Sequence, residues 1–434
     1  MTANCDYVPV AALAQPESLL RELERAFRGV SSADTVVAFR CAESVASVCV
    51  RGAHFSVEPR REAVKIGCIA KLLTAALARR AFDTGSLTPD HDVGDALGRG
   101  ADGRALRGVT VRQLLDHSHG LDDSVLEAVP RRAGARIDPE ALARALRAAP
   151  ALAPPGALYS YGSAGPWLIA ALLERCSGRS YSTQVRHEIL APLGIRELSS
   201  EREPICPATG GALLLDPTEL LRFVAHVALQ RPDAWPDVEP SLTDGPVFPL
   251  PGWNPLERGV YLGWKYHGQG WFGHQSLWPA ASLLVRAHPR RALALVVASR
   301  THSAAVVAAR VFGTHFPELF DLRVPAAPSA AQPGNGVFGS AAWHVEIQGR
   351  EIYVRRRGVR AGHRASLDRL GGGVSLTRPA LDSFPHVEVL ARGGSLYLWN
   401  GRFVLRKRDA AQSKPNASST FPGVPTNPAL PAVT

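Results

Sequence analysis

Cys68-Ile69-Ala70-Lys71, continued by LLTAALARRA to Ala81, is the most informative segment of this 434-residue chain. It is rich in Leu and Ala and contains no Gly or Pro, so we predict a buried helix over residues 69–81 that starts near Cys68. One helical turn separates Cys68 from Lys71, which places the sulfur and the amine on the same face. N–H groups at the start of a helix favour a thiolate there. The pattern indicates a nucleophile beside an amine; the alternative is an ordinary helix lysine that extends to solvent.

Lysine is rare in this chain, which makes Lys71 more informative. Lys and Arg together number 49, yet only five residues are lysines: Lys65, Lys71, Lys265, Lys407 and Lys414. A guanidinium does not release its proton near neutral pH, whereas a partly buried amine can act as a general base. We therefore expect Lys71 to take part in chemistry.

Two later segments follow in a fixed order, GVTVRQLLDHSHGL over residues 108–121 and PGALYSYGSAG over residues 155–165. Together with the C-x-x-K helix, they resemble the serine β-lactamase and penicillin-binding protein superfamily. The resemblance is to its class C-like esterase and transacylase branch, which has an S-x-x-K helix and a later Y-x-N loop. It covers residues 35–300 of this chain.

The resemblance assigns roles residue by residue. Cys68 stands at the position of the nucleophilic serine, Lys71 at that of its partner lysine, and Tyr161 at that of the tyrosine general base. Ser163 stands where the family has Asn. The resemblance therefore implies Cys68, Lys71 and Tyr161 as catalytic residues and Ser163 as a substrate-binding residue.

Two tyrosines compete for the role of the base. We choose Tyr161 over Tyr159 because Pro155-Gly156 precedes it by six and five residues and Ala164-Gly165 follows it, as in the family's loop. Without the resemblance, either tyrosine is read as a core or interface residue.

The third family element, a K-T-G or H-x-G strand beside the cleft, is best matched by His274-Gln275-Ser276. Glycine at the position of Ser276 usually lets substrate lie close to the strand, so the serine is expected to narrow the cleft. The resemblance also implies that the backbone N–H groups of Cys68 and Leu277 hold an oxyanion. We therefore assign His274, Ser276 and Leu277 to substrate binding; read alone, His274 is a surface strand histidine.

Hydrophobic periodicity predicts helices and strands in an α+β arrangement. Helices are expected over residues 17–29, 69–81, 111–117, 139–148, 167–176 and 217–229, a sheet-edge hairpin over 36–39 and 45–50, and strands over 260–264, 282–287 and 292–299. With the resemblance, this implies the β-lactamase/transpeptidase-like fold, an antiparallel sheet flanked by helices plus a helical lobe.

Four regions follow along the chain. Residues 1–320 are predicted to form the catalytic domain, and residues 321–342, rich in Ala, Pro and Gly, a linker. Residues 343–408 are predicted to form a small accessory β-domain, in which Asn400-Gly401 joins two strands of a hairpin. Residues 409–434 have the composition of a disordered tail.

Composition and the N-terminus limit the function classes. The first residues lack a secretory signal, and no apolar stretch of about 20 residues is present, so we expect a cytoplasmic protein with no membrane partner. In that compartment its six cysteines, including Cys5, are expected to be free thiols. The net charge of +10 comes from Arg interleaved with acids, which does not indicate nucleic-acid binding. No metal-ligand set, phosphate loop or dinucleotide fingerprint is present, so no metal or cofactor is expected.

A cysteine nucleophile changes the expected reaction. The intermediate would be a thioester, which reacts with amines more readily, relative to water, than an oxygen ester does. We therefore favour a transacylase that forms an amide from a small-molecule ester or thioester donor and an amine acceptor, in antibiotic-type secondary metabolism. The alternatives are a β-lactamase-like hydrolase, that is an esterase or amidase, and a catalytically inactive binding or scaffold protein.

Overall fold

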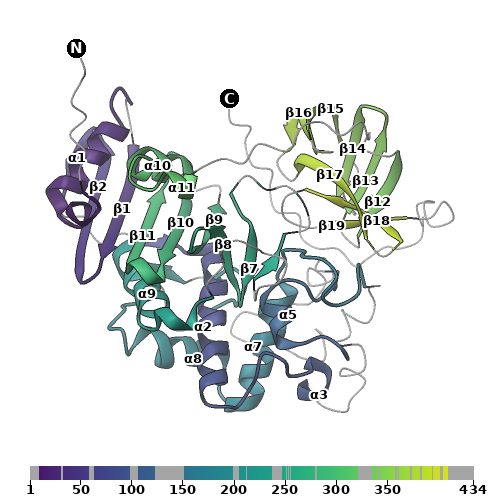
Figure 1. Ribbon diagram of the computed structural model, residues 1–434, viewed down its shortest axis with the longest axis horizontal. Coiled ribbons are helices and arrows are strands. Elements are labelled where there is room, and N and C mark those ends of the chain that lie inside the picture. The colour runs from purple at the N-terminus through teal and green to yellow at the C-terminus, as the bar shows by residue number, and fades with distance from the viewer. Residues whose placement is uncertain are drawn as a thin grey trace.

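The structure is a computed structural model. It describes residues 9–30, 33–57, 63–97, 106–122, 151–198, 205–211, 213–236, 247–250, 252, 254, 256–278, 281–320, 335–340, 343–356, 359, 361–371, 374–381, 384–392, 394–400 and 404–408. The described helices and strands form a helix-covered sheet and a separate small barrel (Figure 1).

A nine-stranded antiparallel sheet is the centre of the larger part, with the strand order β3-β2-β1-β11-β10-β9-β8-β7-β6. Its strands are β1 (Ala33–Cys41), β2 (Ser44–Gly52), β3 (His54–Ser56), β6 (Phe248–Pro249), β7 (Gly259–Tyr261), β8 (Trp264–Gly268), β9 (Trp271–Trp278), β10 (Ala281–His288) and β11 (Leu293–Ser299). The chain leaves the sheet after β3 and returns at β6, and the helical lobe is inserted between them. A two-stranded sheet of β4 (Val64–Lys65) and β5 (Leu214–Leu215) lies outside it.

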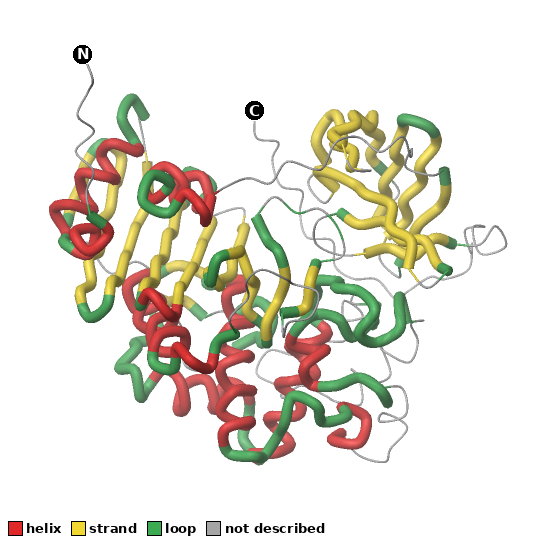
Figure 2. Tube along the Cα trace, in the orientation of Figure 1, coloured by secondary structure: helices red, strands yellow, loops and turns green. Residues whose placement is uncertain are grey.

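Helices cover both faces of the sheet, as Figure 2 shows in red. Alternate residues of the central strands face different cores: Val37 and Phe39 of β1 join one apolar cluster, and Ala38 joins the other. The first cluster lies under η1 (Val10–Ala14), α1 (Pro16–Ala26), α10 (Ala304–Phe312) and α11 (Pro317–Phe320). The second lies under α2 (Ala70–Asp83), α3 (Val93–Leu97), α5 (Val111–Leu115), α7 (Ala164–Ser177), α8 (Tyr181–Gln184), the π-helical η4 (Val185–Leu190) and α9 (Pro217–Leu229). Single 3-10 turns complete this part: η2 (Gly67–Ile69), η5 (Pro232–Ala234) and η6 (Pro289–Arg291).

The α+β prediction is confirmed, with two corrections of detail. The hairpin of β1 and β2 is not the edge of the sheet, because the short β3 pairs outside β2. The single strand predicted over 260–264 is two strands, β7 and β8, joined by a tight turn at Leu262 and Gly263, which both have positive φ. The sequence did not predict this turn, because its first residue is Leu262 and such turns favour Gly or Asn there. The helix predicted over 139–148 lies outside the described residues.

The C-terminal strands close into an eight-stranded barrel, because β12 pairs with both β13 and β19. The strands are β12 (Gly336–Gly339), β13 (Trp343–Gln348), β14 (Glu351–Arg356), β15 (His363–Gly371), β16 (Val374–Leu381), β17 (Phe384–Arg392), β18 (Ser395–Trp399) and β19 (Val404–Lys407). Alternate side chains such as Val345 and Ile347 fill its own apolar core. Closure leaves no open sheet edge between these strands.

Two features of the barrel depart from the sequence pattern. Strand β12 lies within residues 321–342, whose composition predicts a linker, because two of its four residues are glycines and carry little strand signal. In the hairpin of β18 and β19, Trp399 pairs with Val404, so four residues connect the strands instead of the two of an Asn-Gly turn. In the part of the chain that is described, no helix has the length and apolarity needed to cross a membrane.

Candidate active site

The nucleophile candidate lies where the chain enters the central buried helix. Gly67 has a φ of +55° and opens the 3-10 turn η2, after which α2 begins at Ala70. A side chain at position 67 would be strained, since this left-handed conformation favours glycine. Cys68 is half-buried in this turn, and ten of the fourteen residues of α2 are buried. The rigid helix therefore fixes the position of Cys68, as the sequence predicted.

Lys71 is buried and has a neutral hydrogen-bond acceptor. Only 4% of it is exposed, and its Nζ donates to the backbone oxygen of Ala208 at 2.9 Å. The loop that contains Ala208 is fixed to the same helix, because Thr74 donates to Pro207 O at 3.0 Å. Gly210 has a φ of +71°, and a Cβ there would lie 2.8 Å from Ile66. Loop 205–211 therefore packs closely on the start of α2 and holds the amine.

Tyr161, and not Tyr159, lies beside the amine. The Lys71 Nζ is 4.6 Å from the centroid of the Tyr161 ring. Tyr159 is 1% exposed and packs on Trp399 of the barrel at a centroid distance of 5.9 Å. Ser163 occupies the N-cap position of α7, two residues after Tyr161, and is half-buried. The structure thus brings Lys71 and Tyr161 together and gives Tyr159 a packing role.

Strand β9 packs against η2, the turn that carries Cys68. Its Ser276 is buried, and the Ser276 Oγ accepts a hydrogen bond of 3.2 Å from the backbone N–H of Cys68. One of the two N–H groups expected to hold an oxyanion is therefore occupied by this hydroxyl. Leu277, which carries the other N–H, pairs with Ser282 of β10. The serine in place of glycine therefore occupies an N–H group that the resemblance assigns to the oxyanion.

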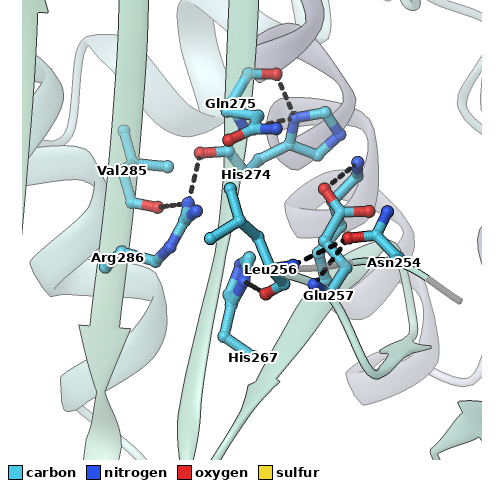
Figure 3. Close-up of polar contacts among 9 residues, drawn as sticks. Asn254, Leu256, Glu257, His267, His274, Gln275, Val285 and Arg286 are labelled. Carbon is cyan, nitrogen blue, oxygen red and sulfur yellow. Dashed lines mark hydrogen bonds and ion pairs between the residues drawn. The ribbon is translucent and has the colours of Figure 1, made fainter. Parts of the chain in front are cut away.

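His274, on the same strand, is a buried residue of the site and not a surface histidine. Its Nδ1 accepts from the Gln275 N–H at 2.9 Å, and its ring centroid is 5.8 Å from that of Tyr161. Burial, together with the charges of Lys265 and Lys71, holds the pKa of His274 well below its usual range. Arg286 donates to the His274 backbone oxygen at 2.9 Å and fixes the strand from behind (Figure 3). His274 therefore presents a neutral imidazole to the site.

A second lysine lies against Tyr161, and sequence reasoning did not select it. Lys265 of β8 is buried, its Nζ lies 4.8 Å from the centroid of the Tyr161 ring, and it forms an ion pair of 2.5 Å with buried Glu257. Asn254 orders the segment around Glu257, because its Oδ1 accepts the backbone N–H groups of Leu256 and Glu257 at 2.9 Å each (Figure 3). The scarcity of lysine, which drew attention to Lys71, applies equally to Lys265 and was the available signal.

His117 is a second neighbour of Tyr161 that sequence reasoning did not select. Its buried ring lies 4.8 Å from the Tyr161 ring, centroid to centroid, and its Nδ1 accepts the Gly162 N–H at 3.4 Å. Burial lowers the pKa of His117 well below the usual value, with Lys71, His119 and Lys265 adding to the effect. This histidine lies in the DHSH segment that supported the resemblance, but its ring gave no separate signal in the sequence. It supports the loop of Tyr161 as a neutral group.

Asp116 connects this side of the site to the strand that carries Lys265. The carboxyl is buried, and it accepts the backbone N–H groups of Leu262 and Gly263 in the turn between β7 and β8. Burial raises the pKa of Asp116 to about 7, and these two hydrogen bonds oppose the rise. The helical lobe and β8 are therefore joined by one titratable group next to the site.

The chemistry of the site rests on one thiol, two ammonium groups, a phenol and two neutral imidazoles. Cys41, Cys49, Cys68, Cys176 and Cys206 are free thiols, as predicted; Cys5 lies outside the described residues. Among the residues with described positions, no group of three or more His, Cys, Asp and Glu side chains is placed to hold a metal ion. The described part of the chain thus gathers a thiol, two lysine amines and a tyrosine at the ends of α2 and β9, groups of the kinds used in nucleophilic catalysis.

The chain belongs to the Beta-lactamase family, because the model of that family matches residues 56–312. This confirms the resemblance seen in the sequence. Penicillin-binding protein 4 of Amycolatopsis lactamdurans is 31% identical over 137 residues, which are 30% of this chain and 34% of that protein. The chain thus spans about a third of the length of this curated relative.

Solved structures share the fold at low sequence identity. A structure of SurE with D-Leu has a TM-score of 0.67 at 20% identity and covers 90% of this chain and 99% of its own. The D-amino acid amidase of Ochrobactrum anthropi SV3, complexed with L-phenylalanine, has a TM-score of 0.51 at 15% identity, with coverage of 68% of this chain and 96% of its own. The β-lactamase-like fold with a C-terminal barrel is therefore established for this chain.

Proposed function

We propose that the protein transfers an acyl group through a covalent acyl-Cys68 intermediate. The Cys68 sulfur attacks the donor carbonyl while Tyr161, assisted by Lys71, accepts the thiol proton. Collapse of the tetrahedral intermediate breaks the bond from the carbonyl carbon to the donor's oxygen or sulfur, and the proton passes to that leaving group. An amine then attacks the thioester; a C–N bond forms, the C–S bond breaks, and the amine proton returns through Tyr161 to the Cys68 sulfur.

One observation supports this proposal most directly. The amine one helical turn after Cys68 is buried, hydrogen-bonded to a neutral carbonyl oxygen, and placed 4.6 Å from the ring centroid of Tyr161. Burial disfavours the charged form of a lysine, and a neutral acceptor offsets this less than a carboxylate does. This arrangement supports our assignment of Lys71 and Tyr161 as the pair that moves the Cys68 proton.

Lys265 has a different part in the proposed mechanism. Its ammonium pairs with Glu257 and faces the Tyr161 ring as a cation. A positive charge over the ring stabilises the phenolate form that accepts the thiol proton. The ion pair thus prepares the base without itself exchanging a proton.

We infer that the product is an amide and that D-amino acyl thioesters are the donors to test first. The thioester intermediate favours aminolysis, and two proteins that share the fold are a SurE bound to D-Leu and a D-amino acid amidase. We assign the reaction to antibiotic-type secondary metabolism in the cytoplasm, a reducing compartment that suits five free thiols. The hydrolase alternative differs only in that water takes the place of the amine.

Product partitioning tests the proposal. The protein is incubated with N-acetyl-D-leucyl and N-acetyl-L-leucyl thioesters of N-acetylcysteamine, with and without about 5 mM of a primary amine, and amide and acid are quantified. We expect amide to exceed acid by at least about tenfold for the better donor. Equal amounts of acid with and without amine would instead identify a hydrolase. No turnover of any donor, with Cys68→Ala indistinguishable from wild type, would identify a binding protein.

A further inference from the structure

The barrel packs directly on the loop that carries Tyr161. A separate apolar cluster, distinct from the barrel's own core, joins Leu158 and Tyr159 of that loop to residues of β17, β18 and β19. On the barrel side it contains Leu390, Tyr397, Trp399 and Val404. Tyr161 itself packs against its border. We call these residues the docking cluster.

The centre of the docking cluster is an aromatic pair. Trp399 is 0% exposed, and its ring meets that of Tyr159 at a centroid distance of 5.9 Å and an interplanar angle of 70°. An edge-to-face pair of this kind adds directional packing to the area that it buries. The chain before β7 also reaches Trp399, because a Cβ on Gly252 would lie 2.6 Å from its ring. Trp399 therefore has little freedom to move.

Ser160, the residue between Tyr159 and Tyr161, forms a buried hydrogen bond to the barrel. The backbone N–H of Val404, at the start of β19, donates to the Ser160 Oγ at 3.3 Å. Ser160 is 8% exposed, so the bond is sheltered from water. Loss of the hydroxyl would leave a buried N–H without its acceptor, which is costly.

The opposite side of the loop is held by His117. Its backbone oxygen accepts the Ser160 N–H at 2.7 Å, and its ring contacts both tyrosine rings, at 5.9 Å for Tyr159 and 4.8 Å for Tyr161. Residues 159–162 therefore lie between the helical lobe on one side and the barrel on the other. Of these two supports of the loop, only the barrel belongs to a domain other than the one that contains Tyr161.

We propose that Trp399 and the Ser160–Val404 hydrogen bond are positioning elements that hold Tyr161 in place, so that the barrel is a working part of the active site. This inference rests on the proposed role of Tyr161 as the base. A base that shifts by about 1 Å loses much of its effect on the rate. The barrel thus acts on catalysis through the backbone of residues 159–162 without contacting the reacting atoms.

The test uses the full-length protein with Ser160→Ala, Ser160→Thr, Trp399→Leu and the matched control Trp343→Leu. Trp343 is also a barrel tryptophan, but it packs on the barrel's own core and lies outside the docking cluster. For each folded variant, the rate constant and the half-saturation concentration for acyl-Cys68 formation are measured separately. Hydrogen exchange of the peptide over residues 157–166 is measured without substrate.

We expect Ser160→Ala and Trp399→Leu to slow acylation between about tenfold and a hundredfold at nearly unchanged half-saturation, and to increase exchange in that peptide. Ser160→Thr, which keeps a hydroxyl, should restore most of the rate, and Trp343→Leu should leave both readouts near wild type. Acylation within twofold of wild type in Ser160→Ala, with unchanged exchange, would overturn the inference whatever Trp399→Leu does. If the wild-type protein does not acylate, the proposed reaction is refuted. Hydrogen exchange of residues 157–166 in the variants then decides by itself whether the barrel holds this loop in place.

Discussion

Two buried lysines lie against the same tyrosine, and their partners differ. Lys71 of α2 donates to the neutral backbone oxygen of Ala208, whereas Lys265 of β8 is paired with the Glu257 carboxylate. Their distances to the centroid of the Tyr161 ring, 4.6 and 4.8 Å, are nearly equal. Position alone therefore does not separate their roles. We propose that Lys71, which donates to a neutral oxygen, exchanges a proton, and that Lys265, which is paired with a carboxylate, acts as a fixed cation.

The largest expected effect is that of Lys71→Arg. Arginine keeps the positive charge but does not deprotonate, so acylation of Cys68 should fall about a thousandfold or more. The matched control is Lys65→Arg, which changes an exposed lysine of β4 in the same way and should stay within twofold. Rapid-quench intact-mass spectrometry measures both rates. An arginine at position 71 with near wild-type acylation would refute a role in proton transfer.

At Lys265, in contrast to Lys71, we expect arginine to be tolerated and a neutral residue to be harmful. Lys265→Arg retains the cation and should keep acylation within about tenfold, whereas Lys265→Met should reduce it about a hundredfold. Lys265→Met also leaves Glu257 buried without its cation, which should destabilise the fold by about 3–5 kcal/mol. Adding Glu257→Gln should recover stability, measured by urea unfolding, but not the acylation rate. If the double variant recovers the rate, Lys265 has a structural role only.

Ser276→Gly tests the part played by the Ser276 hydroxyl of β9. The substitution releases the Cys68 N–H from the Ser276 hydroxyl. We expect acylation to become about tenfold faster, since an oxyanion donor is freed. Stopped-flow release of a chromogenic thiol from a thioester donor measures this rate. A slower Ser276→Gly variant would indicate that the hydroxyl itself contributes to the reaction.

The histidines near the two ammonium groups predict a smaller, pH-dependent effect. The pKa values of His117 and His274 are held well below the usual range, and that of His119 falls to about 4. The unfolded chain therefore binds more protons, and the free energy of unfolding should decrease as pH falls from about 6.5 to 4. Asp116, whose pKa is raised to about 7, acts in the opposite direction over the same range.

Urea unfolding at pH 7, 5.5 and 4.5 measures this acid sensitivity. Each neutral histidine adds at most about 1.4 kcal/mol per pH unit. Replacing His119 by Asn keeps an acceptor for the Leu121 N–H, which now donates to the His119 Nδ1 at 3.1 Å. His119→Asn should therefore reduce the slope by up to one histidine's contribution. An unchanged slope would show that His119 is protonated in the folded protein.

The sequence was sufficient where the chemistry is local. Cys68 and Lys71 are one helical turn apart, and the Leu- and Ala-rich pattern of α2 is visible without any tertiary information. The family's motif order then located Tyr161. The central strands and most helices also follow from periodicity, because each buries one continuous apolar face.

The parts that the sequence did not predict depend on contacts between distant segments. Lys265 and His117 reach Tyr161 from two distant segments of the chain, and Glu257 pairs with Lys265 across the turn between them and belongs to no short motif. The contact of Trp399 with Tyr159 joins residues 240 positions apart, in two domains. The hydrogen bond from Cys68 to Ser276 likewise depends on how β9 packs against η2. Such pairings are set by tertiary packing, which periodicity does not specify.

Peptide mapping of the acylated protein tests the central claim most directly. The protein is quenched within seconds of adding an N-acyl-D-amino acyl thioester, digested, and analysed by mass spectrometry. The account predicts an acyl adduct on Cys68 that is lost when amine is added before the quench, and no adduct in Cys68→Ala. A wild-type protein that forms amide without ever carrying acyl on Cys68, or that carries it on another residue, would contradict the account.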